Sequence, residues 1–530
     1  MPWVSAIVLI PLFGALSMLF VPSGGFVQAR IHALLAAVLT AAFTAYVVVD
    51  FDRGEGGLQH IDHLDWVESI GLSWDVGVDG ISLWMIALTA GLFLLGIAVA
   101  CWRLPECGRA YLALLLLAQA GLMGLFAAGD LVLFYVFWET MLIPFYFLIG
   151  VWGNEDRRAA VVRFVVYTMA GSLLMLVAIL GTAFTARSIT GQFTFLIRDL
   201  EGIPFSTAQS VWLFLGFAIA FAIKLPLFPF HGWLPRVYAA GPILVTALLA
   251  AVMSKAGAYG FMRVGVPLFP EGADIMAVTI GLLALAGIVY GSLLAWRAPT
   301  MRLLVAYSSI AHLGFIAMAI VAFDLQASQG AMLQMVNHGI VVAAAFMVVG
   351  IINRAAPSDR LDSIGGLAFG APRLAAVFLI VAMASLAIPG SNSFAGEFLL
   401  LTGVFRHHPW LAALATLGII YAAVYMLRLY QSSMNGPAHG GRGKDAEMRA
   451  VDYLMLAPLV LAMLVIALWP RGIVGATTNS LERSISPAQV AADRPADQIR
   501  VRIAPNPPPA ALPLPGDPLP EVPVEEVPQP

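Results

Sequence analysis

Long apolar runs alternate with short polar connections along most of this chain. About 20 consecutive apolar residues cross the hydrocarbon core of a bilayer as one helix. The runs, bounded by Gly, Pro and charged residues, predict fourteen membrane-spanning helices and therefore an all-α polytopic membrane protein. Their approximate ranges are 2–21, 31–50, 80–101, 110–128, 130–152, 160–185, 210–235, 241–264, 273–296, 301–322, 329–352, 373–404, 410–430 and 452–469.

Composition agrees with this pattern and excludes several classes of function. Of 530 residues, 60% are hydrophobic and only 11% are charged, whereas soluble domains carry about 25% charged residues. The net charge of −3 provides no basic surface for nucleic acid. No GxGxxG, P-loop or HExxH motif is present, so nucleotide binding and zinc binding are unsupported. Cys101 and Cys107 form no disulfide framework.

Basic residues predict the orientation. The connections after odd-numbered spans hold 16 Lys and Arg residues, and those after even-numbered spans hold 5. Connections rich in Lys and Arg stay in the cytoplasm, so we expect both termini and the acidic loop 52–79 on the opposite side. His60 and His63 lie beside Asp62 and Asp65 in that loop. A solvated loop is favoured there over a metal site.

Four charged residues are predicted deep in the membrane. The chain has three lysines, and Lys224 and Lys255 fall well inside apolar spans. Glu139 and Glu397 are the two acids placed equally deep. Each such charge costs about 2.5–3.5 kcal/mol on insertion scales. Structural ion pairing is one interpretation, but uncharged Ser, Thr and Asn usually join membrane helices, so a functional role is favoured.

Prolines predict breaks next to these charges. Pro226 and Pro229 follow Lys224, Pro389 and Gly390 precede Glu397, and Pro144 follows Glu139. Proline frees a backbone carbonyl, which is tolerated at membrane depth where it lines protein or water. The breaks of spans seven and twelve are five spans apart, as in two inverted five-helix repeats made of spans 4–8 and 9–13.

Three histidines, His231, His312 and His338, fall in or beside the apolar spans and are candidates for a proton relay with the Lys and Glu residues.

The spans and the composition of the C-terminal region divide the chain into five predicted segments. From Pro505 to Pro530, 11 of 26 residues are proline, which favours an extended or surface-lying tail, with a partner-binding strap as the alternative. The segments are N-terminal helices 1–109, a first repeat 110–264, a second repeat 273–430, a loop and last helix 431–472, and a tail 473–530.

Five motifs in a fixed order carry a family resemblance: FYVFWETMLIPFYFLIG, KLPLFPFHGWLP, KAGAYG, MRLLVAYSSIAHLGF and IPGSNSFAGEF. They resemble the antiporter-like membrane subunits of proton-pumping NADH:quinone oxidoreductase (respiratory complex I) over roughly residues 1–470. Within that family the M type (mitochondrial subunit 4) is most similar, because L and N types usually carry lysine where Glu397 stands. The resemblance implies fourteen helices with two inverted five-helix repeats.

The resemblance also implies roles for individual residues. Glu139 matches the glutamate of the fifth helix, Lys224 the lysine of the broken seventh helix, Lys255 the central lysine of the eighth and Glu397 the acid of the twelfth. The three histidines match positions of the internal proton path. Loss of the influence of Glu139 on Lys224 would let a proton pass to Lys255 and on toward Glu397. Two departures from the family pattern lie near the cytoplasmic edge, where Arg236 replaces an acid and Tyr238 a histidine.

The implied function is proton translocation driven by partner subunits that oxidise NADH or another donor and reduce quinone. No cofactor is expected in this chain; FMN, iron–sulfur clusters and quinone are expected in the partners. L- and N-type subunits and lipids are the expected neighbours, in a bacterial inner membrane with both termini in the periplasm. Alternatives are a D-type subunit of a multisubunit Na⁺/H⁺ antiporter, a membrane hydrogenase subunit or a stand-alone solute carrier.

Overall fold

The structure is a computed structural model that describes residues 2–22, 24–67, 71–102, 108–356, 358–437 and 445–494. It divides into a unit Met1–Ala492 and a unit Asp493–Pro530. Only Asp493 and Arg494 of the second unit are described. Cys107 and the proline-rich part of the predicted tail lie outside the described residues.

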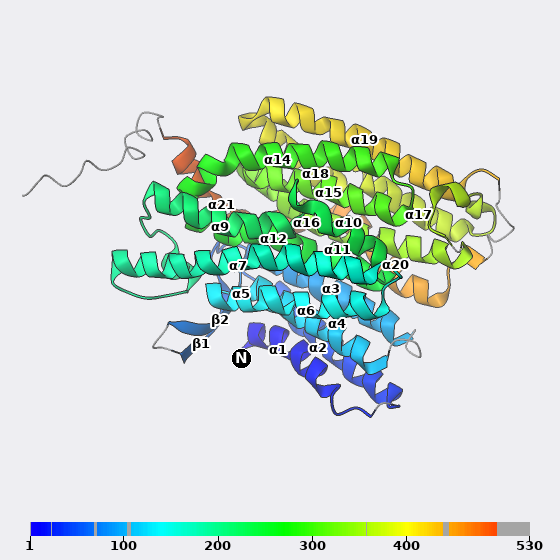
Figure 1. Ribbon diagram of the computed structural model, residues 1–530, viewed down its shortest axis with the longest axis horizontal. Coiled ribbons are helices and arrows are strands. Elements are labelled where there is room, and N and C mark those ends of the chain that lie inside the picture. The colour runs from blue at the N-terminus through cyan, green and yellow to red at the C-terminus, as the bar shows by residue number, and fades with distance from the viewer. Residues whose placement is uncertain are drawn as a thin grey trace, which may run out of the picture. The chain divides into compact units, whose positions relative to one another are not determined.

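Long helices lying side by side build this unit (Figure 1). The helices are α1 (Trp3–Ser17), α2 (Phe26–Asp50), α3 (Gly80–Trp102), α4 (Gly108–Ala127), α5 (Leu131–Thr140), α6 (Leu142–Trp152), α7 (Arg157–Thr190), α8 (Ile197–Leu200), α9 (Thr207–Lys224), α10 (Leu234–Ala240), α11 (Ile243–Ala251), α12 (Ala256–Gly260), α13 (Val266–Leu268), α14 (Pro270–Arg297), α15 (Met301–Ile320), α16 (Leu325–Ala355), α17 (Pro372–Ser385), α18 (Asn392–His407), α19 (Pro409–Met434), α20 (Ala450–Leu468) and α21 (Arg471–Ala492). Short 3-10 helices are η3 (Phe230–Trp233), η4 (Met253–Lys255), η6 (Leu361–Ser363) and η7 (Leu367–Phe369), and η5 (Phe261–Gly265) is a π-helix.

Among the described residues, twelve helices are long and apolar enough to cross a membrane. Two shorter apolar helices, Trp3–Ser17 and Pro372–Ser385, fall within the first and twelfth predicted spans. The protein is therefore an all-α polytopic membrane protein, as the hydrophobic pattern predicts. The total of fourteen spans stays a prediction.

Helix α16 forms the centre of the packing. It packs against α18, α11, α15, α20 and α21, and it is buried along most of its length (Figure 1). A Cβ atom at Gly330 would meet the Leu400 backbone nitrogen at 2.2 Å, so glycine permits the close approach of α16 to α18. This contact fixes the helix that carries His338 against the helix that carries Glu397.

The helix breaks fall where the prolines predict them. α9 ends at Lys224, and α17 ends at Ser385, seven residues before α18 begins at Asn392. The carbonyl of Ala222, which Pro226 cannot bond, accepts instead from the Leu227 N–H at 2.8 Å. The Trp233 indole N–H donates to the Ile223 carbonyl at 2.8 Å. The freed carbonyls of the first break are thus satisfied inside the protein.

The backbone hydrogen bonds of the two breaks recur at one constant spacing. At the first break Leu225, Leu227 and Phe230 donate to Phe221, Ala222 and Leu227. At the second break Leu386, Ile388 and Ser391 donate to Ala382, Met383 and Ile388. Every donor and acceptor of the second set lies 161 residues after its counterpart in the first.

Two regions differ from the sequence-based division. The predicted acidic loop contains an antiparallel hairpin of β1 (Gln59–Val67) and β2 (Leu72–Val78). The predicted tail 473–530 begins instead with helix α21, which packs against α3, α13, α14 and α16. Its buried residues recur every three or four positions, from Gly472 to Ala491. This helical periodicity was hidden because the prolines further along dominate the composition of the segment.

Candidate functional site

Glu139 and Lys224 form the first part of the candidate site. Lys224 ends α9 and is 1% exposed, and its Nζ has no hydrogen-bond partner among the described residues. Nζ lies 4.9 Å from the ring centroid of Trp138, a cation–π contact. The negative charge of the neighbouring residue, Glu139, acts on Lys224, although the Glu139 Oε1 also lacks a hydrogen-bond partner in the described part of the chain. The two side chains are thus close enough for electrostatic coupling, but no hydrogen bond joins them.

The helix that carries Glu139 is interrupted next to it. α5 ends at Thr140 and α6 begins at Leu142. The Thr140 hydroxyl donates to the Val136 carbonyl at 2.7 Å. Both members of the Glu139–Lys224 pair therefore lie beside a break in their helix, which the prolines that follow them predict.

Lys255 lies at a third irregular point. It is fully buried at the end of η4, between α11 and α12. Its Nζ donates to the Ala250 carbonyl at 2.6 Å and lies 2.8 Å from Nδ1 of His338 and 3.3 Å from the Ser254 hydroxyl. The local 3-10 geometry of η4 accompanies this turn of the side chain toward α16.

His338, His312 and Glu397 continue the series. The rings of His338 and His312 are 5.5 Å apart between centroids. His312 Nδ1 lies 3.1 Å from the Glu397 Oε1, which also accepts a 3.0 Å hydrogen bond from the Gln334 amide nitrogen. All three titratable residues are buried. The structure therefore brings together Lys255, His338, His312 and Glu397 from four different helical segments.

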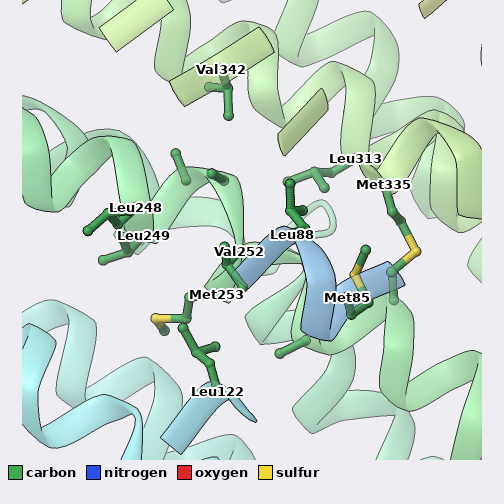
Figure 2. Close-up of a cluster of buried hydrophobic side chains, with 14 of the residues drawn as sticks. Met85, Leu88, Leu122, Leu248, Leu249, Val252, Met253, Leu313, Met335 and Val342 are labelled. Atoms are coloured by element: carbon green, nitrogen blue, oxygen red, sulfur yellow. The ribbon is translucent and has the colours of Figure 1, made fainter. Parts of the chain in front are cut away.

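An apolar layer surrounds the segment that leads to Lys255. Figure 2 shows Leu248, Leu249, Val252 and Met253 of this segment together with Leu122 of α4, among buried apolar side chains from other helices. Charges interact strongly in such a low-dielectric environment. The contacts of Lys255 with Ala250 and Ser254 stay within its own segment, and its contact with His338 reaches across to α16.

His231 is placed apart from the other two histidines. It lies in η3, with its ring stacked on Phe228 at 5.6 Å and 5.2 Å from the ring of Tyr290. Its Nδ1 is buried without a hydrogen-bond partner among the described residues. Of the three histidines singled out in the sequence, the structure joins His312 and His338 and leaves His231 at the first helix break.

The two departures from the family pattern occupy different environments. Tyr238 is fully buried in α10 and packs edge-to-face on Phe346, with ring centroids 5.5 Å apart. Arg236 is exposed on the same short helix. The arginine is therefore available to water or partners, whereas the tyrosine is part of the core.

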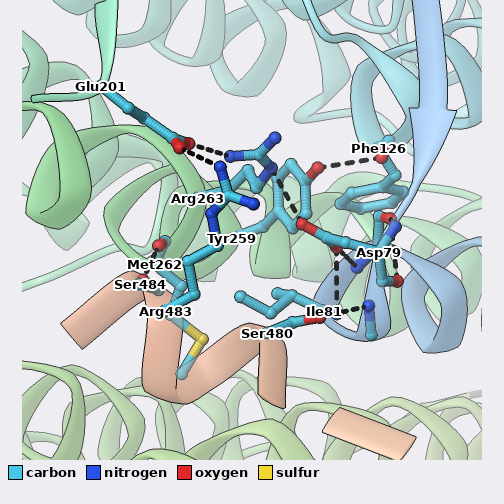
Figure 3. Close-up of polar contacts among 12 residues, drawn as sticks. Asp79, Ile81, Phe126, Glu201, Tyr259, Met262, Arg263, Ser480, Arg483 and Ser484 are labelled. Atoms are coloured by element: carbon cyan, nitrogen blue, oxygen red, sulfur yellow. Dashed lines mark hydrogen bonds and ion pairs between the residues drawn. The ribbon is translucent and has the colours of Figure 1, made fainter. Parts of the chain in front are cut away.

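A buried ion network was missed by the sequence analysis (Figure 3). Arg263 Nε lies 2.9 Å from the Asp79 Oδ2, and its Nη1 donates to the Glu201 Oε1 at 3.1 Å. Glu201 also accepts from Arg483 of α21 at 2.8 Å. Arg263 falls in the eighth predicted span, and Asp79 precedes the third. Their proximity to span ends hid them, although a cation within an apolar run is the same signal that marks Lys255.

The hairpin holds a second polar cluster. Asp75 is fully buried, 2.7 Å from His63 Nδ1 and 3.0 Å from Arg198 Nη1. His63 Nε2 also lies 3.2 Å from Asp65. In the part of the chain that the structure describes, no group of three or more His, Cys, Asp or Glu side chains is arranged to hold a metal ion.

Asp130 caps the helix of Glu139 beside this cluster. Its carboxylate accepts from the backbone N–H groups of Val132 and Leu133 at 2.8 and 2.9 Å. Burial raises the pKa of Asp130 from 3.8 to about 6, against the opposing effect of these two hydrogen bonds. The N-terminal end of α5 therefore carries a carboxyl group whose protonation is favoured by burial.

Comparisons with known proteins agree with the geometry. Residues 128–421 match the family described as NADH:quinone oxidoreductase/Mrp antiporter, TM. NADH-quinone oxidoreductase subunit M of Rhodobacter capsulatus is 37% identical over 451 residues, covering 84% of this chain and 88% of that protein. The subunit M of Rickettsia typhi is 34% identical over 451 residues, covering 85% and 90%.

Solved structures show the same relationship. A chain of respiratory complex I from Thermus thermophilus with bound NADH superposes with a TM-score of 0.81 at 34% identity, covering 91% of this chain and 99% of that one. A chain of the Mrp complex from Dietzia sp. DQ12-45-1b shares the fold, with a TM-score of 0.80 at 21% identity over 93% of this chain and 99% of that one. The chain therefore belongs to the NADH:quinone oxidoreductase/Mrp antiporter family of membrane proteins, with M subunits of NADH-quinone oxidoreductase among its relatives.

Proposed function

We propose that this chain is the M-type antiporter-like subunit of a bacterial NADH:quinone oxidoreductase and moves protons across the inner membrane. The observation that carries the proposal is the buried series Lys255–His338–His312–Glu397. Its first and last pairs lie within hydrogen-bond distance, and the rings of the middle pair are 5.5 Å apart between centroids. Ionisable groups inside a membrane bundle mark ion and proton pathways. A series of them that crosses from one half of the bundle to the other has little structural purpose.

The Glu139–Lys224 pair supplies the control step. A facing carboxylate stabilises the Lys224 ammonium, and desolvation destabilises it. Because no hydrogen bond closes the pair, a small displacement of either helix end changes the balance. When the influence of Glu139 weakens, the Lys224 proton is released toward Lys255.

The proton then passes from Lys255 across the helix bundle toward Glu397. Lys255 passes its proton to His338, and His312 delivers a proton to Glu397. Imidazole suits these steps because its two nitrogens accept and release protons near neutral pH. The proton leaves from Glu397 toward the periplasmic side. His231 at the first break serves as a separate group on the uptake side.

Two inverted repeats would place the control pair and the later proton-transfer groups in different halves of the protein. The three backbone hydrogen bonds that recur at the two breaks, spaced by 161 residues, support the pairing of spans 4–8 with spans 9–13. We assign residues 110–264 and 273–430 to the two repeats, after N-terminal helices 1–109. Glu139, Lys224 and Lys255 belong to the first repeat, and Glu397, His312 and His338 to the second.

Partner subunits supply the energy. We propose that they carry FMN, iron–sulfur clusters and quinone, and that L- and N-type subunits and lipids flank this chain. Both termini then lie in the periplasm, as the distribution of Lys and Arg predicts. A D-type subunit of a multisubunit Na⁺/H⁺ antiporter is the alternative, since the Mrp complex shares the fold.

One experiment tests both the partners and the activity. The intact complex is purified from its own membranes, its chains are identified by mass spectrometry, and proton translocation is measured after reconstitution. Co-purifying flavin and iron–sulfur subunits with NADH-driven pumping, lowered by Glu397→Gln, are the expected result. Co-purification with only antiporter subunits, or pumping unchanged by Glu397→Gln in a fully assembled complex, would overturn the proposal.

A further inference from the structure

Gln334 lies at the one gap in the buried series. It is 1% exposed on α16, four residues before His338 and therefore on the same face of the helix. Its amide nitrogen donates to the Glu397 Oε1 at 3.0 Å. Its amide oxygen is buried and has no hydrogen-bond partner among the described residues. Leaving such an acceptor buried and unsatisfied is destabilising, so the position needs an explanation.

The orientation of the amide follows from its partner. An ionised carboxylate only accepts hydrogen bonds, so the NH₂ group of Gln334 must face Glu397 and the C=O must face away. The absence of a side chain at Gly396 makes this arrangement possible, because a Cβ there would meet the Gln334 Oε1 at 2.7 Å. Both the donor and the acceptor of Gln334 thus have fixed directions.

Gln334 also lines a small cavity. Its volume is about 20 Å³, and its lining includes Gln334, His312 and His338 together with the hydroxyl-bearing residues Ser308, Ser385 and Ser393. About 10–15 Å³ on this measure is enough for one water, which also needs two to four polar partners. The cavity meets both conditions.

The two imidazoles need such a bridge. Their ring centroids are 5.5 Å apart, and each Nδ1 is already engaged, with Lys255 on one ring and with Glu397 on the other. A charged Lys255 donates to Nδ1 of His338, which leaves a proton on the His338 Nε2. An ionised Glu397 accepts from Nδ1 of His312, which leaves the His312 Nε2 as an acceptor.

We propose that Gln334 is the positioning residue of the relay: its amide nitrogen holds Glu397, and its amide oxygen anchors a single water that joins His338 to His312. The His338 Nε2–H donates to this water, and the water donates to the Gln334 oxygen and to the His312 Nε2. Every hydrogen then points from Lys255 toward Glu397. When His312 gives its Nδ1 proton to Glu397, it takes a proton from the water at Nε2, and the water takes one from the His338 Nε2. His338 takes the Lys255 proton at Nδ1, so each histidine stays neutral, Lys255 becomes a neutral amine and Glu397 becomes protonated.

This inference rests on the proposed function and names the group that completes its path. Gln326 provides a matched control, since it lies on the same helix and also donates across to α18, to the Thr402 hydroxyl at 2.6 Å. Its replacement removes one interhelical hydrogen bond without touching the relay. Any loss shared by both replacements is therefore due to helix packing.

The test uses the assembled complex reconstituted in vesicles. We expect Gln334→Leu to lower the rate of coupled proton translocation about tenfold or more, while Gln326→Leu stays near the wild type. Loss of a proton-transfer group itself would cost about 100-fold or more. In a high-resolution map of the wild-type complex, one water should lie within hydrogen-bond distance of the Gln334 oxygen, and it should be absent in Gln334→Leu. Wild-type translocation in assembled Gln334→Leu, or no water at this position in the wild-type map, would overturn the proposal.

Two further variants separate this inference from the function beneath it. Lys255→Arg tests the relay itself: if neither Lys255→Arg nor Gln334→Leu affects translocation, the proposed function fails, whereas an effect of Lys255→Arg alone refutes only the role of Gln334. Gln334→Glu has the shape of glutamine and can donate to Glu397 only when protonated. It faces Glu397, His312 and His338, with Lys255 and Tyr425 near them. It should therefore restore translocation toward acidic pH and not at alkaline pH, a dependence that a merely structural role would not produce.

Discussion

Lys255 and His338 face each other across the interface of two helices, with Nζ 2.8 Å from Nδ1. Both groups are buried, since Lys255 is fully buried and His338 is 6% exposed. The contact joins the lysine of the predicted first repeat to a histidine of the second. Its chemistry distinguishes a relay from a structural contact, since only a relay requires Lys255 to give up its proton.

Lys255→Arg should therefore impair proton translocation even where the complex assembles. Arginine keeps the positive charge but holds its proton at every working pH. We expect coupled translocation to fall by about 100-fold, within the usual range for a lost proton-transfer group. Lys255→Ala should impair it equally and also lower assembly. Protons translocated per electron pair are the measurement, and wild-type coupling in assembled Lys255→Arg complexes would favour a structural cation.

Glu139→Gln should preserve assembly and reduce coupled activity. The glutamine has the same shape but removes the charge that acts on Lys224. Because the Glu139 Oε1 has no hydrogen-bond partner among the described residues, little packing depends on its charge. Glu139→Asp should be milder. NADH-driven translocation by the reconstituted complex is the readout, and normal rates for an assembled Glu139→Gln complex would remove Glu139 from the mechanism.

The C-terminal region should divide functionally after α21. A chain cut after Pro505, or one ending at Ala492, should still translocate protons, because a proline-rich tail provides no membrane path. A chain that ends before α21, at Trp469, should fail to accumulate, because it exposes the surfaces of α3, α13, α14 and α16 that α21 covers. The amount of assembled complex on native gels measures both. Full assembly without α21 would contradict the structural assignment.

Protonation of Asp130 should influence stability between about pH 4 and 6. The pKa of Asp130 is raised in the folded protein from 3.8 to about 6 by burial. The folded state therefore binds more protons than the unfolded state in this window, and stability falls as the pH rises through it. Asp130→Asn keeps an N-cap acceptor for α5 and removes the buried charge. It should stabilise the protein by up to about 3 kcal/mol above pH 6.

Thermal unfolding in detergent across this pH range tests that expectation. Asp156→Asn is the matched control, since Asp156 also precedes a helix but makes no side-chain cap hydrogen bond. A flatter pH dependence should appear for Asp130→Asn alone. If Asp130→Asn unfolds at a lower temperature than the wild type at pH 7, the carboxylate is needed in its charged form.

The sequence predicts where the helices break better than it predicts which side chains of the candidate site are in contact. Pro226 and Pro389 mark the ends of α9 and α17 because proline removes a backbone donor, a local effect that sequence reports directly. The 3-10 segment at Lys255 has no proline or turn signal and depends on the partners of its side chain. The separation of His231 from His312 and His338 likewise depends on how the helices pack, which the spacing of residues along the chain does not encode.

The buried pair of Arg263 and Asp79 gives a test of stability that is separate from the relay. Their side chains are 10% and 6% exposed, and Arg263 also pairs with Glu201, which Arg483 of α21 contacts in turn (Figure 3). Removing one member of a buried pair costs about 3–5 kcal/mol when the remaining charge is left uncompensated. Arg263 keeps Glu201 as a partner in Asp79→Leu, so this variant should destabilise the protein by up to that amount.

The double variant Asp79→Leu/Arg263→Leu should lose less stability than the summed losses of the two single variants. In the double variant both charges of the pair are removed, so neither remains buried without its partner. The exposed pair Arg360–Asp362 is the control, and its disruption should change little because water screens it. Thermal unfolding and the yield of assembled complex measure these effects. Complexes that assemble without the Asp79–Arg263 pair should translocate protons normally, since the pair lies outside the contacts that link Lys255 to Glu397. A specific loss of translocation in stably assembled Asp79→Leu/Arg263→Leu complexes would instead place this ion pair on the proton path.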